Sequence, residues 1–376
     1  MERQKNRHQQ ITSMQARQTA IQKFTSNPLA LAGSMFILLL TLVCLLGPWI
    51  RPDQSLDANE QHLVLAKLRP GEEIQFIRVR KENQVPVSWL EMWWQGGREA
   101  DWVEIPVSQA SLVYGKLMVE PMDISDIELT SQGFDPSALY SHDGEGVDAF
   151  IFHRTFWAGT DKYGRDLLSR LMAGASVSLS VGAIAVIISL LIGITLGLLA
   201  GYFRGWPDRI IMWFTNVVWS IPTLILVMAI TFAFGTGYWK IFLAVGLTMW
   251  VEIARLVRGQ VLSVREKEYI EAARVMGLSD VRIMFVHILP NIISPVIVMA
   301  AANFASAILV EAGLSFLGLG AQIPSPSWGN IIREHVSFIT TGQAYLALVP
   351  GLLMMLLVLS FMMVGNGLRD ALDVRD

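Results

Sequence analysis

Long uninterrupted runs of apolar residues alternate with polar segments along this chain of 376 residues. A helix needs about 20 apolar residues to cross the roughly 30 Å hydrocarbon core of a bilayer. Runs of that kind predict six membrane-spanning helices, over Leu29–Ile50, Val177–Phe203, Ile210–Phe234, Ile241–Val257, Ile292–Val310 and Tyr345–Val364. We therefore expect an all-α polytopic membrane protein, and a composition of 53% hydrophobic and 16% charged residues excludes an ordinary soluble domain.

The first apolar run is interpreted as a retained helix and not as a cleaved signal peptide, because it is longer than a usual signal and follows a polar arm, residues 1–28. Asn27 and Pro28 predict its start, as N-cap and first helical residue. Lys and Arg mark the cytoplasmic side of short connections. They gather in the arm, after the second apolar run and in a polar loop over residues 258–290, which predicts cytoplasmic N- and C-termini.

The segment 51–157 is then extracytoplasmic, and it contains 18 acidic against 9 basic residues. Alternating polar and apolar residues over Glu73–Arg80 and Trp102–Ile105 predict short strands, so we expect a small β-rich insertion domain. Its tryptophans could line a ligand site, or could belong to the domain's own core or to the membrane interface: Trp89, Trp93, Trp94 and Trp102. Cys44 is the single cysteine, so an intramolecular disulfide is excluded.

The sequence contains no phosphate-binding G-x-x-x-x-G-K-[ST] loop, no H-E-x-x-H zinc pair and no G-x-S-x-G nucleophile elbow. We assign no catalytic, cofactor-binding or metal-binding residue and expect no enzyme. Energy would come from another chain or from an ion gradient. A membrane-anchored sensor and an ion-coupled carrier working alone are the alternatives from other functional classes, although a carrier would need carboxylates near the midplane of the membrane.

The polar loop over residues 258–290 carries the candidate docking site. Strong helix formers with acids early and Arg274 late predict a short helix that ends near Gly277. Ala272 and Ala273 have almost no side chain, so the surface of another protein could approach the backbone closely. A solvated surface loop is the alternative.

The loop resembles the signature loop of bacterial ABC import permeases, whose short helix docks in a cleft of the ATP-hydrolysing subunit. The resemblance rests on Glu271, Ala272, Ala273, Gly277, Leu289 and Pro290, with His287 where the family pattern has isoleucine. Three further segments resemble the second permease subunit of the dipeptide, oligopeptide, opine and nickel importers: Gly159–Asp166, Glu311–Gly320 with Pro326–Gly329, and Gly367–Asp373. The segment 51–157 is longer than in typical members.

This resemblance implies a type I ABC importer permease fold, with a permease core over residues 158–376 that contributes five of the six spans, and with the loop 258–290 coupling it to the ATPases. It implies peptide transport across the bacterial cytoplasmic membrane, with nickel or opine import as the alternative. The implied partners are a homologous permease, two cytoplasmic P-loop ATPase subunits that bind the ATP, an extracytoplasmic solute-binding protein and membrane lipid, with no nucleic acid.

Other residues are candidates for structural or path roles. Gly193, Gly197 and Gly201 recur every four residues, which predicts close packing against another helix of the bundle or of the partner subunit, or alternatively a gate hinge. Pro222 breaks the third span, so Ser220 and Thr223 are predicted to lie near the translocation path.

Charged candidates lie near the ends of the spans. Asp161, Arg165 and Asp166 are expected to brace the external mouth, with substrate contact as the alternative, and Thr160 and Asp161 are good caps for the helix that follows. Glu252 is predicted to pair with Arg255. Glu311 is a candidate for the translocation path, and the alternative is that its side chain reaches the external membrane interface.

Overall fold

The computed structural model describes residues 21–81, 88–122, 132–142, 144, 146–235, 238–322 and 324–372. The basic residues of the predicted arm up to Arg17, together with Asp373, lie outside these ranges. The chain divides into two compact units. The sheet unit comprises Leu42–Val177 and Ile323–Pro350, and the helical unit comprises the chain up to Thr41, Ser178–Gln322 and the chain from Gly351 onward.

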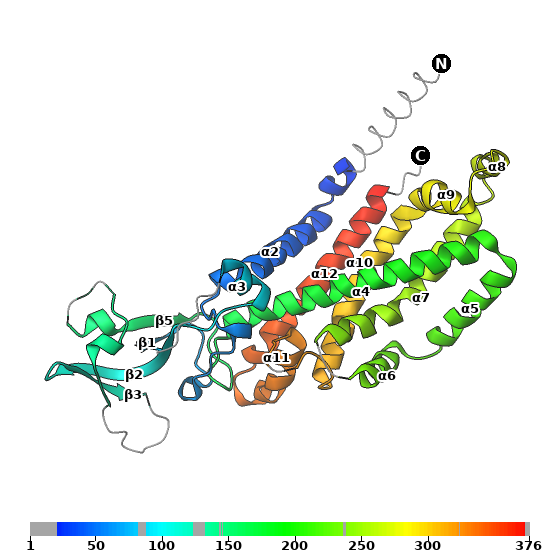
Figure 1. Ribbon diagram of the computed structural model, residues 1–376. Coiled ribbons are helices and arrows are strands. Elements are labelled where there is room, and N and C mark those ends of the chain that lie inside the picture. The colour runs from blue at the N-terminus through cyan, green and yellow to red at the C-terminus, as the bar shows by residue number, and fades with distance from the viewer. Residues whose placement is uncertain are drawn as a thin grey trace. The chain divides into compact units, whose positions relative to one another are not determined.

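Helices make up most of the chain (Figure 1). Helix α2 begins at Pro28. The Asn27 side-chain oxygen accepts hydrogen bonds from the backbone N–H groups of Leu29 and Ala30, at 3.1 and 3.2 Å, which confirms the predicted cap. The α-helices are α2 Pro28–Ile50, α3 Trp89–Gln95, α4 Leu167–Phe203, α5 Gly205–Trp219, α6 Thr223–Phe234, α7 Tyr238–Val264, α8 Glu268–Val275, α9 Asp280–Arg282, α10 Leu289–Phe316, α11 Trp328–His335 and α12 Tyr345–Leu372.

Four helices within the described ranges are long and apolar enough to cross a membrane: α2, α4, α12 and the continuous helix Asp280–Phe316 that contains α10. Helices α5 and α6 meet the same standard together but are bent by 93°, so they add a fifth span only if the bent pair forms one. Four charged residues interrupt the apolar sequence of α7: Lys240, Glu252, Arg255 and Arg258. The prediction of six spans is therefore supported for four or five helices, and α7 remains a predicted span.

The helices also differ in length from the apolar runs that predicted them. Helix α4 begins at Leu167, ten residues before the predicted boundary, because the helix continues through a polar turn that contains Arg170. The third predicted span, residues 210–234, is two helices with a break at Ser220–Pro222. An apolar run therefore marks the part of a helix that lipid can surround. It does not mark the residues at which the helix begins and ends.

The sheet unit contains five antiparallel strands in the order β4-β3-β2-β1-β5. The strands are β1 Glu72–Arg80, β2 Trp102–Val113, β3 Lys116–Pro121, β4 Gln132–Phe134 and β5 Phe152–Phe156. Side chains of β1 point to opposite faces, so Phe76 packs with Leu65 and Phe156 while Ile77 packs with Val107 and Leu117. Both faces of this part of the sheet are therefore covered.

Candidate functional site

The short helix of the polar loop, α8, ends at a left-handed glycine. Glu268 and Glu271 lie in its first turn and Arg274 in its last, which complements the helix dipole. Gly277 has φ +73°, and its N–H donates to the Arg274 carbonyl oxygen at 2.9 Å, while the Leu278 N–H donates to the Ala273 carbonyl oxygen at 3.2 Å. These bonds satisfy carbonyl groups left over at the helix end and turn the chain sharply. A residue with a Cβ would be strained there.

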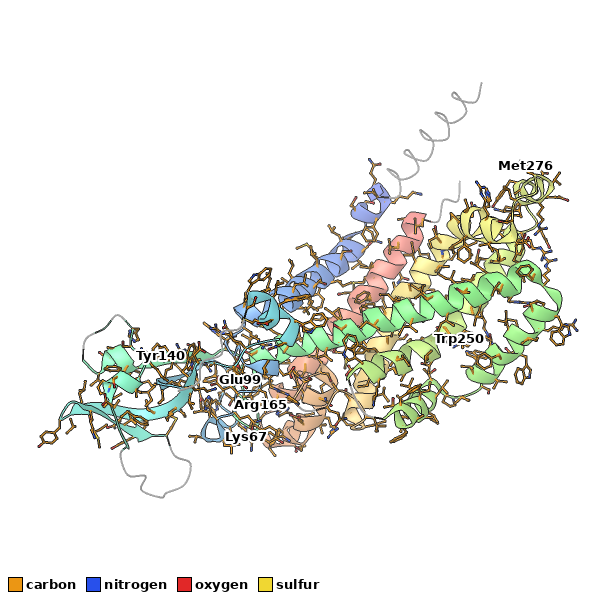
Figure 2. All side chains as sticks on the ribbon, viewed as in Figure 1. Lys67, Glu99, Tyr140, Arg165, Trp250 and Met276 are labelled. Carbon is orange, nitrogen blue, oxygen red and sulfur yellow. The ribbon has the colours of Figure 1, made fainter. Side chains whose placement is uncertain are left out.

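The two alanines of this helix face different ways. Ala273 is buried beside Ile270 in a hydrophobic cluster that includes Val261 and Ile283. Ala272 is exposed together with Glu271, Arg274, Val275 and Met276, and Val275 and Met276 are 84% and 72% exposed. Met276 lies at the far tip of the loop (Figure 2). Ala272 is therefore available to a partner, whereas Ala273 anchors the helix to its own chain.

Tyr202, near the end of α4, contacts several parts of the polar loop. Its hydroxyl donates to an Asp280 carboxylate oxygen at 2.6 Å, and the Arg265 guanidinium donates to its backbone carbonyl oxygen. The Arg274 guanidinium lies 5.1 Å from the centre of its ring. The sequence pattern did not indicate a role for Tyr202, because its loop partners are more than 60 positions away and a tyrosine at the end of an apolar run is typical of a membrane interface.

The loop joins α10 through a wide helical turn. Residues Ile283–Ile288 form a π-helix directly before Leu289 and Pro290. Pro290 has no N–H to donate to the preceding turn, which explains a local departure from α-helical bonding. The Asn291 side-chain amide donates to the His287 carbonyl oxygen at 2.7 Å and satisfies one acceptor of this turn. Leu289 and Pro290 thus mark the joint between loop and span.

The glycines of α4 pack against α7 of the same chain. A Cβ at Gly193 would lie 2.6 Å from the Ile253 Cβ, and one at Gly197 would lie 2.7 Å from the Ala254 carbonyl oxygen. At Gly201 it would lie 2.7 Å from the Val261 Cβ. The close approach is therefore made within this chain, and the spacing of the glycines allows two helix backbones to meet.

Replacing Gly197 by alanine is expected to lower the free energy of unfolding by about 1–3 kcal/mol, because the added methyl group must displace a backbone carbonyl. Thermal unfolding of the detergent-solubilised protein would measure the change. Gly259→Ala is the matched control, because a Cβ at Gly259 on α7 would meet nothing within 4 Å. Equal destabilisation by both substitutions would contradict this packing role.

A cavity of about 280 Å³ lies beside the break between α5 and α6. Pro222 and Thr223 line it, whereas Ser220 does not, and the Ser220 hydroxyl donates to the Val217 carbonyl oxygen at 2.7 Å. The lining includes polar groups from two further helices that the sequence analysis did not assign to a path: Thr248, Glu252 and Ser306. Hydroxyl groups and one carboxylate therefore face a common space among apolar helices.

The predicted pair of Glu252 and Arg255 is not among the ion pairs formed by the described residues. The Arg255 guanidinium donates to the Asn216 side-chain oxygen at 2.6 Å and lies 4.0 Å from the centre of the Trp219 ring. Both partners lie on α5, so tertiary packing overrides the helical spacing. Glu252 is exposed and lines the cavity.

Glu311 on α10 is not among the residues that line that cavity. Its side chain is buried, at 1% exposure, and it accepts a hydrogen bond of 2.6 Å from the Ser315 hydroxyl one turn later. This burial within the helical unit excludes a carboxylate that reaches a water-exposed surface of the chain. Glu311 therefore does not share the cavity lining with Pro222 and Thr223.

The predicted mouth residues form a buried network in the sheet unit. Asp161, Arg165 and Asp166 are exposed by 0%, 1% and 3%. The Arg165 guanidinium donates to Asp161 at 2.5 Å and to Glu334 at 2.7 Å, and also to Asn59 at 3.2 Å. Arg165 is labelled in Figure 2. A bound solute has no access to these groups, which favours bracing over substrate contact.

Asp166, and not Thr160 or Asp161, caps α4. Its carboxylate accepts a hydrogen bond of 2.9 Å from the Ser169 N–H, while Asp161 accepts bonds within its own turn from the N–H groups of Tyr163 and Arg165. Burial raises the pKa of Asp166 despite the bonds from Ser169. The cap falls at Asp166 because the helix starts at Leu167, directly after it.

Two groups of side chains in the described ranges place metal-ligating atoms close together, Glu60 with His62 and Glu104, and Asp161 with Glu334 and His335. Arginine side chains form ion pairs with the carboxylates of both groups. Arg154 lies 2.7 Å from Glu104 and 3.4 Å from Glu60, and Arg165 joins Asp161 to Glu334. These carboxylates are neutralised by cations of the chain itself, so we assign no metal to them.

Comparison with known proteins decides the family. Residues 193–375 match the family described as the binding-protein-dependent transport system inner membrane component, and residues 16–69 match the N-terminal TM domain of oligopeptide transport permease C. The chain is 44% identical over 217 residues to a dipeptide transport system permease protein of Alkalihalophilus pseudofirmus, an alignment that covers 58% of this chain and 71% of the relative. The chain belongs to this family of binding-protein-dependent transport permeases.

Other relatives agree with this membership. A glutathione transport system permease protein of Pectobacterium atrosepticum is 43% identical, and a di/tripeptide transport system permease protein of Pseudomonas aeruginosa is 42% identical, each with 58% of this chain and 72% of the relative covered. Among solved structures, the MetNI methionine ABC transporter in an inward-facing conformation covers 53% of this chain and 93% of its own, with 21% identity and a TM-score of 0.45.

The permease family accounts for part of the chain. The glycine stripe, the cavity and the polar loop lie within residues 193–375, and α2 lies within residues 16–69. All five strands and helix α3 lie between the two matched ranges. The sheet is therefore a feature that this permease carries beyond the family's matched parts.

Proposed function

We propose that this permease is one membrane subunit of an ABC importer that moves peptides across the bacterial inner membrane and is energised by separate ATPase subunits. The observation that carries the proposal is the polar loop. It combines an exposed face over Glu271, Ala272, Val275 and Met276, here called the loop surface, with a buried face that fastens it to α4 and α7. Such a helix can accept force from a partner and transmit it to the spans.

The proposal includes a specific assembly. A homologous permease would complete the pathway, two cytoplasmic P-loop ATPases would bind ATP and contact the loop surface, and a solute-binding protein would deliver substrate from outside. Both termini and the loop would lie in the cytoplasm, and this chain would bind no nucleotide and catalyse no reaction. The proposed topology has six spans, with α7 and the bent pair of α5 and α6 included.

Closure of the ATPase pair on ATP would pull on α8. Ile270 and Ala273 pack with Val261 on α7 and with Ile283 before α10, so a displacement of α8 reaches both helices. Those helices also line the cavity beside Pro222. Movement of the loop would therefore change the lining of the cavity, which is the proposed part of the translocation path.

Peptides are the substrate class favoured by the relatives, which are named for dipeptide, di/tripeptide and glutathione transport. The cavity lining fits such a solute chemically. Thr223, Thr248 and Ser306 offer hydroxyl groups for peptide amides, and Glu252 offers a carboxylate for an ammonium group. A path needs weak contacts of this kind, because tight binding would hold the solute.

The proposal is tested by extracting the tagged chain from its native membrane in mild detergent and identifying the bound proteins by mass spectrometry. We expect two P-loop ATPases and a homologous permease. Reconstitution of that complex with its binding protein should give ATP-dependent uptake of a radiolabelled dipeptide. A chain purified alone or with a signalling protein would contradict the assembly, and uptake of nickel or an opine in place of the dipeptide would contradict the substrate.

A further inference from the structure

Helix α3 of the sheet unit has an unusual composition, Trp-Leu-Glu-Met-Trp-Trp-Gln over Trp89–Gln95. Its one charged side chain, Glu91, is engaged at the start of the helix, where it accepts a hydrogen bond of 2.9 Å from the Ser88 N–H. The helix ends at Gly96 in the left-handed conformation. The remaining surface of α3 therefore carries no charge.

The large side chains of α3 are directed away from the protein. Trp94 is 79% exposed, Trp89 66%, Leu90 55% and Trp93 42%, whereas Met92 is buried at 7% and holds the helix to the sheet unit. The four exposed residues lie at positions i, i+1, i+4 and i+5, so they share one side of the helix. An exposed apolar face of this kind marks a contact with another body.

Hydrogen bonds fix α3 beside the end of a membrane span. The Arg51 guanidinium, directly after the last residue of α2, donates to the carbonyl oxygens of Gly96 and Ser55. Three residues beyond the last residue of α3, the Arg98 N–H donates to the Gln54 carbonyl oxygen at 2.8 Å. A helix of seven residues is only about 10 Å long. The C-terminal end of α3 therefore lies within the reach of one arginine side chain from the end of α2, and its first residue lies at most about 10 Å further away.

From this placement we infer that α3 is an interfacial membrane anchor, whose face of Trp89, Leu90, Trp93 and Trp94 inserts among the headgroups and upper acyl chains of the lipid leaflet at the Ile50 end of α2. Tryptophan is enriched at this depth because its ring is apolar while its N–H can bond to headgroups. The 23 residues of α2 span the hydrocarbon core, so Arg51 lies at the boundary where such a helix would rest.

The anchor attaches the sheet unit to the membrane at a further point, in addition to the spanning helices. Because α3 is attached through Arg51 to the residues after α2, insertion of the tryptophans limits rotation of the sheet unit about that connection. The occupant is lipid and not a partner protein, since the face is uncharged and α3 is bonded through Arg51 to the end of a spanning helix.

The test places a fluorescent label on the face within the assembled transporter in lipid nanodiscs. Cys44 is replaced by serine, and Trp94→Cys is labelled with an environment-sensitive dye. Brominated lipids quench dyes in the bilayer and iodide quenches dyes in water. Tyr114→Cys provides the matched control, because Tyr114 is 102% exposed at the turn between β2 and β3.

We expect brominated lipids to reduce the emission at position 94 by about half and iodide to have little effect there, as for a side chain at the interface. Position 114 should respond to iodide. Quenching of position 94 by iodide and not by lipid would place it in water and overturn the inference. Protection of position 94 from both quenchers would show a protein cover and overturn it as well, while the uptake measurement tests the transport proposal independently.

Discussion

The Arg165→Ala substitution is expected to lower the free energy of unfolding by about 3–5 kcal/mol. Arg165 is 1% exposed and lies between Asp161 and Glu334, at 2.5 and 2.7 Å. Without Arg165, the cation that remains near the fully buried Asp161 carboxylate is Arg170, at 3.8 Å. A buried carboxylate deprived of its partner is costly because the desolvation penalty remains after the attraction is gone. Thermal unfolding in detergent, or loss of protease resistance, would measure the effect.

Arg165→Lys is also expected to destabilise the protein, since an ammonium group cannot replace the planar guanidinium that reaches Asn59, Asp161 and Glu334 at once. The matched control is Glu266→Gln, which breaks the pair of Glu266 with Arg204. Those side chains are 67% and 43% exposed, so the loss should be at most about 1 kcal/mol. If Arg165→Ala unfolds at the same temperature as this control, the network does not brace the sheet unit.

The Ala272→Arg substitution is expected to weaken coupling and to leave the fold intact. Ala272 is exposed on the loop surface, so the larger side chain can be accommodated in the isolated chain. A long charged side chain at a close contact with the proposed ATPases should cost about 1–3 kcal/mol, which lowers ATP-dependent uptake about 5- to 150-fold. Reconstituted uptake and the amount of ATPase that co-purifies would be measured together.

Two further variants make this test specific. Ala138→Arg changes an exposed alanine on the sheet unit and should leave uptake unchanged. Ala273→Arg should instead reduce the amount of folded protein, because Ala273 is 1% exposed in the core beneath α8. Full uptake with Ala272→Arg, at a normal yield of assembled transporter, would show that the loop surface does not contact the ATPases.

The sequence analysis anticipated features that depend on near neighbours in the chain. Asn27 and Pro28 start α2, and Pro222 lies at the 93° break between α5 and α6. Gly193, Gly197 and Gly201 share one helix face, as their spacing predicted. Each depends on backbone chemistry within one or two helical turns, where the number of possible arrangements is small.

The identity of distant partners could not be anticipated in this way. Arg165 meets Glu334 across 169 positions, and the Tyr202 hydroxyl meets Asp280 across 78. Arg255 contacts Asn216 and Trp219 in place of Glu252, which lies one turn away on its own helix. Helical spacing brings side chains within reach, but packing against a neighbouring helix decides which partner takes the contact.

The sequence by itself determined the apolar helices and the short helix of the polar loop, because these follow from composition, periodicity and local motifs. The permease family followed from the resemblance of its motifs to those of known proteins. Tertiary structure alone decided that Ala272 is exposed while Ala273 is buried, that the glycine stripe meets α7, and that the tryptophans of α3 face outward. The physical reason is that burial and partner choice depend on how segments far apart in the chain pack, and local sequence does not encode that packing.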